Sequence, residues 1–198
     1  MASSPLHLAA FDLQKLRAGT LARTVSSLPT EIASLDEALS GGLPRGSVVE
    51  LCASRGLGRA TRIALAACAS AQQQSERDRW CAWVDASGTL YAPGVARAGV
   101  DLKRLLVVRP ESADIAKVAV RLAASQVFSV LVIDRCGIPG AAIHEKQLRW
   151  STAVRRLALA AEGSDTTILL LSNEQQARES LPVAMRIELE RPSVDQLH

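Results

Sequence analysis

The sequence predicts an α/β protein with three layers, in which a mostly parallel sheet is covered by helices on both faces. Short aliphatic runs bounded by turn residues alternate with longer segments whose apolar residues recur at helical spacing. Continuous aliphatic runs are typical of strands that are buried on both faces. The chain has 198 residues, of which 48% are hydrophobic and only 3% aromatic, so we expect one compact domain with an aliphatic core.

Five aliphatic runs are expected to form the strands of this sheet. They are Ser47–Cys52, Cys81–Asp85, Leu105–Val108, Val130–Asp134 and Thr167–Leu171. A last run, Ala184–Glu190, alternates apolar and polar residues. This alternation predicts an antiparallel edge strand with one solvated face near the C-terminal end.

The segments between the strands are expected to form crossover helices, because their apolar residues repeat about every 3.6 positions. These segments are Arg59–Gln74, Tyr91–Ala98, Ser112–Ser125 and Glu145–Ala161. Ahead of the first strand, Ser34 and Glu37 form a capping-box pattern that predicts a helix start at Ser34. A glycine-rich turn over 41–46 follows this helix.

Three parts of the chain are expected. They are a leader or arm over 1–28, a core domain over 29–191 and a tail over 192–198. Within the leader, Phe11–Arg17 predicts a short helix. Three apolar residues of this helix are candidates for binding a partner: Phe11, Leu13 and Leu16.

Charge and cysteine content limit the classes of function. The net charge of +3 is too small for a protein that coats nucleic acid, so any contact with DNA requires a local patch. The cysteines form no C-x-x-C pair and lie mostly in apolar runs, which indicates reduced core residues: Cys52, Cys68, Cys81 and Cys136. No apolar stretch approaches the roughly 18 residues of a membrane span. We therefore expect a cytoplasmic protein without membrane contact.

The first predicted strand leads directly into a glycine-containing turn and a helix, which is where a phosphate-binding loop lies. The residues of this turn are Ala53, Ser54, Arg55, Gly56, Leu57, Gly58, Arg59 and Ala60. The pattern of such a loop needs glycine, lysine and a hydroxyl in place of Ala53, Arg59 and Ala60, and only Gly58 fits. A forked guanidinium does not replace the compact ammonium of lysine. The segment is therefore either a plain strand-to-helix turn or a vestigial loop that binds ATP or another anion weakly.

No catalytic or metal site is predicted from the remaining polar residues. Asp134 ends a strand where a phosphate-loop domain places the carboxylate that orients Mg²⁺, but Ala60 lacks the hydroxyl that would complete the ligands. Asp85 ends another strand, with no second carboxylate nearby to activate water. The three histidines are scattered, and no zinc pattern or nucleophile elbow occurs.

A basic stretch over 144–156 contains one aromatic residue. Arg149 and Trp150 are therefore candidate contacts with a partner or with the phosphates of single-stranded DNA. Single-strand platforms usually carry several aromatic residues, so the alternative is a solvated helix face with Trp150 packed inward.

The order of several motifs resembles the RecA recombinase family. LPTEIASLDEAL and GGLPRGSVVE, within 28–50, are similar to the start of the RecA ATPase core, and WVDA, GVD and VLVID follow in the same order. This resemblance covers 28–191 and implies a RecA-like core of the phosphate-loop NTPase type. The variant GTLYAP, with LLVVRP downstream, is similar to the ImuA family, the RecA-like component of a bacterial DNA-damage-induced mutagenesis cassette.

The same resemblance implies that the ATPase groups of RecA are replaced. RecA uses a lysine, a hydroxyl, a glutamate that activates water, a tyrosine that stacks on adenine and a glutamine that senses the γ-phosphate. The resemblance places these groups, in that order, at Arg59, Ala60, Ser87, Gly94 and Asn173. Tyr91 lies three residues before the stacking position. The segments that match the two DNA-binding loops are also short. These departures imply a non-catalytic protein that needs no cofactor.

The ImuA resemblance implies an adaptor or regulator in SOS-induced translesion DNA synthesis, near the bacterial nucleoid. The implied partners are RecA, whose filaments it would limit, ImuB, an inactive relative of Y-family polymerases, and an error-prone DnaE-type DNA polymerase. Single-stranded DNA is a further candidate partner. Two alternatives stay open: a nucleotide-dependent recombinase paralogue that ATP would stabilise, and a single-stranded DNA-binding module whose affinity would fall steeply with salt.

Overall fold

A computed structural model describes residues 26–53, 58–74, 79–135, 143–173 and 180–189, except for the side chains of 143–149. The strands of the main sheet are β3 (Ser47–Ala53), β4 (Trp80–Asp85), β5 (Leu105–Val108), β6 (Phe128–Asp134), β7 (Thr167–Asn173) and β8 (Met185–Leu189). They lie in the order β5-β4-β6-β7-β3-β8, and every neighbouring pair is parallel. All five predicted aliphatic runs are therefore strands of one sheet.

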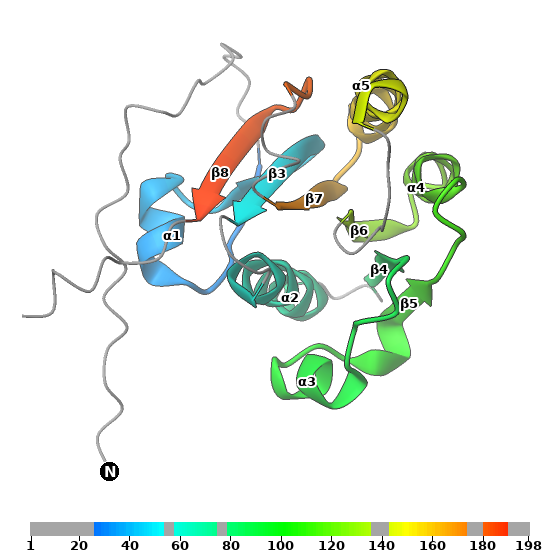
Figure 1. The fold of residues 1–198 in the computed structure, drawn as a ribbon. Coiled ribbons are helices and arrows are strands. Elements are labelled where there is room, and N and C mark those ends of the chain that lie inside the picture. The colour runs from blue at the N-terminus through cyan, green and yellow to red at the C-terminus, as the bar shows by residue number, and fades with distance from the viewer. Residues whose placement is uncertain (1–25, 54–57, 75–78, 136–142, 174–179, 190–198) are drawn as a thin grey trace, which may run out of the picture.

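Helices cover both faces of this sheet. The helices are α1 (Ala33–Ala38), α2 (Gly58–Gln73), α3 (Ala92–Arg97), α4 (Ile115–Ala124) and α5 (Ile143–Ala161), with a 3₁₀ turn η2 (Leu102–Arg104) before β5. Figure 1 shows α2 on one face and α4 and α5 on the other. The predicted three-layer α/β fold is confirmed. No helix in the described ranges is both long and apolar enough to cross a membrane.

The aliphatic runs are continuous because each inner strand is buried on both faces. In β6, Val130 and Val132 belong to the core beneath α2, whereas Leu131 and Ile133 belong to the core beneath α4 and α5. All four side chains are fully buried. Two aliphatic cores thus hold the three layers together.

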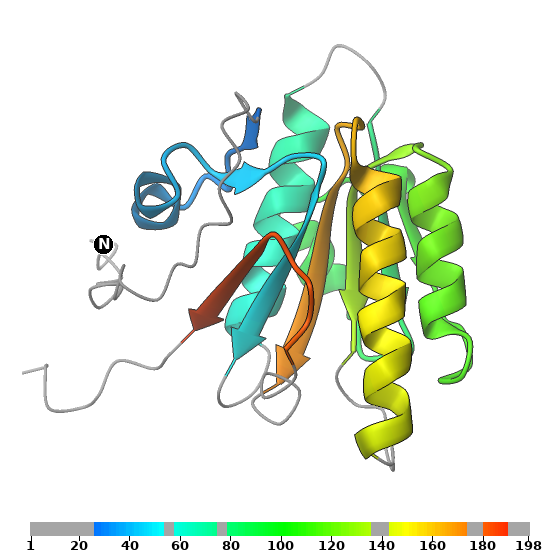
Figure 2. The same ribbon diagram turned by 90° about the horizontal axis from the view of Figure 1, so that it is seen from above.

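The edge strand β8 runs parallel to β3, so the predicted antiparallel direction is wrong. Its ladder with β3 joins Val49 to Met185 at one end and Ala53 to Leu189 at the other. The arrowheads of β3, β7 and β8 point to the same end of the molecule in Figure 2. Before β8 begins, the backbone N–H of Ala184 donates to the carbonyl of Val48, near the start of β3. The chain therefore returns along the sheet before it pairs.

The start of α1 also differs from the predicted capping box. The helix begins at Ala33, and no side chain caps its N-terminus. Asp36 makes the polar contacts instead, because its carboxylate accepts the backbone N–H of Thr30 at 2.9 Å and the hydroxyl of Thr30 at 2.8 Å. Thr30 is fully buried, so the carboxylate satisfies groups that water does not reach. Ser34 and Glu37 do not form the predicted cap.

A small antiparallel ribbon precedes the main sheet and was not predicted. It joins β1 (Ser27–Leu28) to β2 (Leu43–Pro44), and both leucines are fully buried. Leu28, the last residue of the expected leader, thus lies in the core. The candidate partner residues of the leader, Phe11, Leu13 and Leu16, lie outside the described residues, as does the expected tail.

Candidate functional site

The carboxyl ends of β3, β4, β6 and β7 meet at one edge of the sheet. In the ladders Asp85 lies opposite Asp134, and Ala53 lies opposite Asn173. In parallel α/β sheets, ligands bind in the crevice beyond these ends, where chain connections diverge to opposite faces. The fold therefore brings four residues selected from the sequence into one row.

The segment expected to be either a plain turn or a vestigial phosphate-binding loop lies between β3 and α2, so its predicted place between a strand and a helix is confirmed. Ala53 is buried at the end of β3, while Gly58 and Arg59 are exposed at the start of α2. Ala60 is fully buried, and its side chain is a methyl group, so this position has no hydroxyl. The intervening residues lie outside the described ranges: Ser54, Arg55, Gly56 and Leu57.

The carboxylate of Asp85 makes several hydrogen bonds within the chain. It is completely buried and accepts the backbone N–H groups of Thr89 at 3.0 Å and Leu90 at 3.2 Å. The guanidinium of Arg109 donates to it at 3.2 Å. These bonds hold the turn after β4 and leave the carboxylate poorly placed to activate water.

The positions that match the catalytic glutamate and the stacking tyrosine lie next to this turn. Ser87 has a hydroxyl in place of the carboxylate, and this hydroxyl forms a hydrogen bond with that of Thr89 at 3.0 Å. Gly94 lies in α3, and a Cβ placed on it would lie 3.4 Å from the ring of Tyr91. The Tyr91 ring therefore occupies space beside the expected stacking position, although 71% of this residue is exposed.

A cavity of about 280 Å³ opens at this end of the sheet. Its polar lining includes Thr61, Tyr91 and Asp134, and the indole of Trp83 forms part of its wall. No lysine or arginine is among the described residues that line it. The described part of this lining suits contact with a small, mostly apolar or heterocyclic group.

Metal-binding groups are sparse in the described ranges. No group of three or more histidine, cysteine, aspartate or glutamate side chains that could hold a metal ion occurs there. Asp134 is buried at the end of β6, and Asp85 opposite it already accepts hydrogen bonds from Thr89, Leu90 and Arg109. The three described cysteines are buried free thiols, as predicted, and Cys136 lies outside the described residues.

A buried ionic cluster lies close to the same edge and was not predicted. The carboxylate of Glu50 is completely buried and accepts the hydroxyl of Ser172 at 2.7 Å and the Nη2 of Arg186 at 2.7 Å. The Nη1 of Arg135 lies 3.8 Å from it. A signal was present in the sequence, because a glutamate inside the aliphatic run of β3 requires a cation or several donors.

This cluster extends to Trp150, one of the candidate partner residues. The guanidinium carbon of Arg135 lies 4.5 Å from the centre of the Trp150 ring, which is a cation–π contact. The ring is partly buried and packs against the core beneath α4 and α5. This arrangement agrees with the inward-packed alternative. Arg149 belongs to the part of α5 whose side chains are not described.

The amino-acid sequence matches the model of a known family. The family model of the RecA N-terminal domain matches residues 12–183. This chain belongs to the RecA N-terminal domain family. The RecA-like superfamily expected from the motifs is thereby confirmed, and the ImuA assignment stays a prediction.

Individual RecA proteins show the extent of the similarity. The RecA-like chain is 35% identical to the RecA protein of Kineococcus radiotolerans over 172 residues, and 34% identical to that of Nocardia farcinica over 182 residues. These matches cover 80% and 85% of this chain, but only 47% and 50% of the two RecA proteins. The RecA protein of a Picosynechococcus species is 31% identical, over 77% of this chain and 46% of its own length. The chain thus spans about half the length of the RecA proteins that it matches.

Proposed function

We propose that this RecA-like chain is a non-catalytic adaptor or regulator in SOS-induced translesion DNA synthesis, which binds RecA and limits its filaments. The main support is an intact RecA-like sheet beside a site whose expected reactive groups are replaced. Ala60 supplies no hydroxyl, Ser87 supplies no carboxylate, and the Asp85 carboxylate is bonded to Arg109 and to backbone N–H groups.

The proposed mechanism follows from the geometry of head-to-tail assembly. A filament grows because each subunit presents two different faces that fit the next subunit. A RecA-like subunit that offers only one compatible face adds to an end and stops growth there. The family fold supports compatibility with RecA, whereas the altered site favours a subunit that does not cycle with ATP.

The further partners in this proposal are ImuB and an error-prone DnaE-type DNA polymerase. They rest on the ImuA-like segment GTLYAP, which forms the turn after Asp85 and leads into α3. This segment lies at the surface, with Tyr91 and Ala92 exposed. Copurification of the chain with ImuB would test this part separately from RecA binding. Replacing residues 88–93 by the corresponding RecA segment should abolish the copurification.

The first experiment measures ATP hydrolysis in the presence of single-stranded DNA. The chain alone should give a flat baseline, and titration into RecA should progressively suppress RecA turnover. The controls are the same chain after boiling and serum albumin, each titrated into RecA at equal mass. DNA-stimulated hydrolysis by the chain alone, abolished by Asp134→Asn, would overturn the non-catalytic proposal.

A second candidate function is that of a nucleotide-dependent recombinase paralogue. It is favoured by the cavity at the carboxyl edge, in which Tyr91 lies beside the expected stacking position and Asp134 is kept. A ligand in this cavity would contact the Trp83 indole, so titration with Mg·ATP should change tryptophan emission and raise the thermal midpoint. An unchanged spectrum and midpoint would exclude this candidate.

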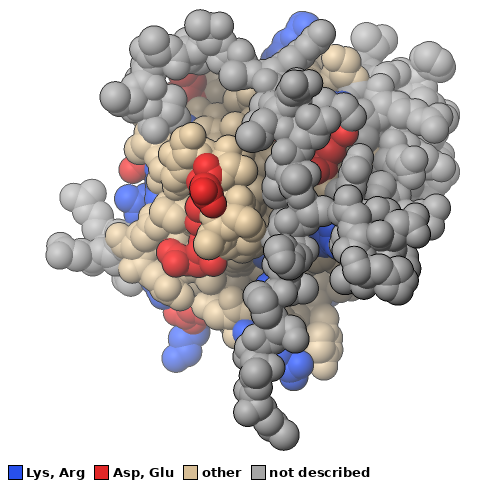
Figure 3. Space-filling view, turned by 90° about the vertical axis from the view of Figure 1, so that its left-hand side faces the viewer, with Lys and Arg blue, Asp and Glu red and all other residues tan. Residues whose placement is uncertain are grey.

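The single-stranded DNA-binding module has less support. On the face that carries α1, acidic side chains lie among uncharged surface, and the described part of this face shows no broad basic area (Figure 3). Titration of labelled single-stranded DNA at several salt concentrations separates this alternative, because phosphate contacts give a steep loss of affinity with salt.

A further inference from the structure

The outer side of α4 and α5 carries only positive charge along its described middle. Figure 1 and Figure 2 show these two helices side by side, on the face of the sheet opposite α2. Within Ile115–Ala124 and 150–161 every charged residue is basic and exposed: Lys117, Arg121, Arg155 and Arg156. The acidic residues Asp114 and Glu162 lie just outside these ranges, one before α4 and one after α5. We call these four residues and the surface between them the basic face.

The basic residues of α4 point away from the sheet. Lys117 and Arg121 are four residues apart, so they lie one turn apart on the same side of the helix. The opposite side of α4 is packed into the core, because Ile115, Ala119 and Ala123 are buried. The two charges of α4 therefore face solvent together.

A large apolar side chain lies among the charges of α5. Leu159 is 70% exposed, and it follows Arg155 by four residues and Arg156 by three, so the three share one side of the helix. The side that faces the sheet carries Val154 and Leu157, which are fully buried. An exposed leucine beside two arginines matches the pattern of a protein contact surface, in which an apolar centre is surrounded by charged groups.

Little of the charge on the basic face is neutralised by the described part of the chain. Lys117 lies 3.8 Å from the carboxylate of Asp114, but both side chains are more than half exposed, and such pairs are weak. Arg121, Arg155 and Arg156 form no ion pair with another described residue. Their forked guanidinium groups are suited to bind carboxylates through two hydrogen bonds.

The basic face suits an acidic protein better than nucleic acid. No aromatic side chain in its described part is exposed, because the Trp150 ring is partly buried and contacts Arg135, so it offers no platform for stacking bases. The phosphates of a duplex would leave Leu159 without an apolar partner. A helix fits this surface because its side chains, three and four residues apart, form ridges that pack between those of another helix.

We propose that the basic face docks an acidic amphipathic helix of a partner protein. The helix places apolar residues against Leu159 and pairs its flanking carboxylates with Arg155, Arg156 and Arg121. Amphipathic helices are recognised in this way through anchors at positions i, i+3, i+4 and i+7. This docking site rests neither on nucleotide binding nor on the proposed action at RecA filaments.

Fluorescence anisotropy with defined peptides and the full chain tests this proposal. The probe is a fluorescein-labelled peptide of about 18 residues, with leucine along one side of the helix and glutamate elsewhere. A control peptide has the same composition in a permuted order, so its leucines do not share one side. The amphipathic peptide should bind with a Kd of roughly 100 μM or tighter, and the permuted peptide at least roughly ten-fold more weakly. Equal binding of the two, or no amphipathic binding up to roughly 1 mM, overturns the proposal.

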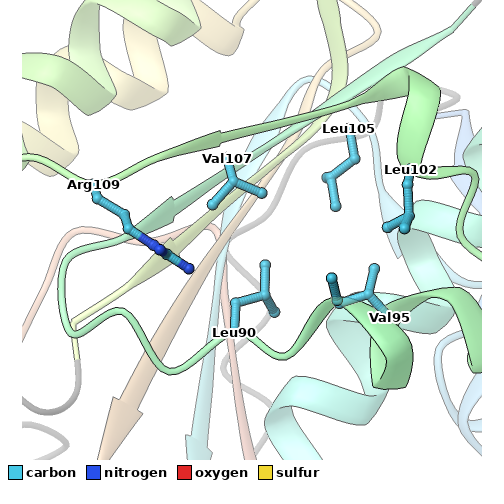
Figure 4. A pocket seen from close by; sticks show the side chains of 7 residues that line it. Leu90, Val95, Leu102, Leu105, Val107 and Arg109 are labelled. Atoms are coloured by element: carbon cyan, nitrogen blue, oxygen red, sulfur yellow. The ribbon is translucent and has the colours of Figure 1, made fainter.

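Matched variants locate the binding. Leu159→Glu and Arg155→Glu should each weaken the amphipathic peptide roughly ten-fold or more. Leu102→Glu and Arg97→Glu are the controls, because they make the same changes of charge at exposed residues on the other side of the sheet. Figure 4 shows Leu102 there, across a cavity from Val95 of α3. A loss in the controls as large as that in the two variants of the basic face overturns the proposal.

Two further outcomes would assign the basic face to another occupant and overturn the proposal. The first is DNA that binds more tightly than the peptide and loses affinity in Arg155→Glu, which identifies a nucleic-acid surface. The second is a homodimer that dissociates in Leu159→Glu on sedimentation, which identifies a second copy of the chain. Arg156→Glu replaces Leu159→Glu if circular dichroism shows that the latter is misfolded.

Discussion

Arg186 on the edge strand β8 lies directly opposite Glu50 on β3, and its Nε and Nη2 lie 2.9 Å and 2.7 Å from the same oxygen of that completely buried carboxylate. The other oxygen accepts the hydroxyl of Ser172 and faces Arg135. Charge-assisted bonds of this kind are stronger than neutral ones. The last strand is therefore held to the sheet by a buried ion pair as well as by its backbone ladder.

We predict that Glu50→Gln destabilises the fold by about 3 kcal/mol, because it removes the anion from between two arginines. Equilibrium unfolding in urea measures the change. Glu188→Gln on the exposed side of β8 is the matched control and should shift stability by less than about 0.5 kcal/mol. Equal effects of the two substitutions would mean that the buried pair contributes no more than a surface charge.

The thiol of Cys52 should make stability depend on alkaline pH. Burial and the negative charge of Glu50 raise its pKa from 9.0 to about 12, so the folded chain keeps a proton that the unfolded chain releases. The thiol therefore contributes stability below about pH 9 that is lost as pH rises toward 12, with a slope of about 1.4 kcal/mol per pH unit. Urea unfolding measures the free energy of unfolding of wild type and of Cys52→Ala across this range. The difference between the two free energies should narrow as pH rises. A constant difference between the two free energies across this pH range would contradict the raised pKa of Cys52.

Gly42 should be intolerant of any side chain. Its φ is +125°, and a Cβ would lie 2.3 Å from the carbonyl oxygen of Leu28, within the β1–β2 ribbon. We expect Gly42→Ala to cost more than about 2 kcal/mol in the free energy of unfolding. Gly58→Ala is the control, because a Cβ there meets nothing within 4 Å and the residue begins α2. A loss at Gly58 as large as that at Gly42 would show that the steric argument fails.

The fold was predictable because continuous aliphatic runs in the sequence indicate that its inner strands are buried. Runs such as Val130–Ile133 are aliphatic at every position, which fits a strand covered on both faces and little else. The direction of β8 was not predictable, because alternation of Arg186, Ile187 and Glu188 fixes which side chains are buried but not how the strand runs. Direction depends on the path of the chain before Ala184, which no local pattern encodes.

The candidate site was predictable in position but not in its contacts. Strand-terminal aspartates and a glycine-containing turn indicate the carboxyl edge, whatever residues fill it. The pairing of Asp85 with Arg109 joins positions 24 apart, and that of Glu50 with Arg186 joins positions 136 apart. Neither spacing follows a helical or strand period, so only the folded sheet brings these groups together. Of these four residues, only Glu50 indicated a buried ionic contact in the sequence, because it is a charged residue inside an aliphatic strand.

Restoring the missing groups of the phosphate-binding loop should restore nucleotide binding without turnover. In the double variant Arg59→Lys with Ala60→Thr, we expect the affinity for Mg·ATP to rise at least roughly ten-fold, because a compact ammonium and a hydroxyl for Mg²⁺ return. Isothermal titration calorimetry measures the affinity. The control is Arg59→Lys with Ala60→Val, which has the same volume at the buried position but no hydroxyl.

Hydrolysis should need a further change, since Ser87 cannot activate water and the Asp85 carboxylate is held by Thr89, Leu90 and Arg109. The double variant should therefore bind Mg·ATP with no DNA-stimulated phosphate release, and release should begin only when Ser87→Glu is added. If the valine control gains as much affinity as the threonine variant, metal ligation by a hydroxyl is not what the site lacks. If the double variant hydrolyses ATP without Ser87→Glu, a carboxylate already present activates water. The chain would then be an ATPase in which only phosphate binding was lost.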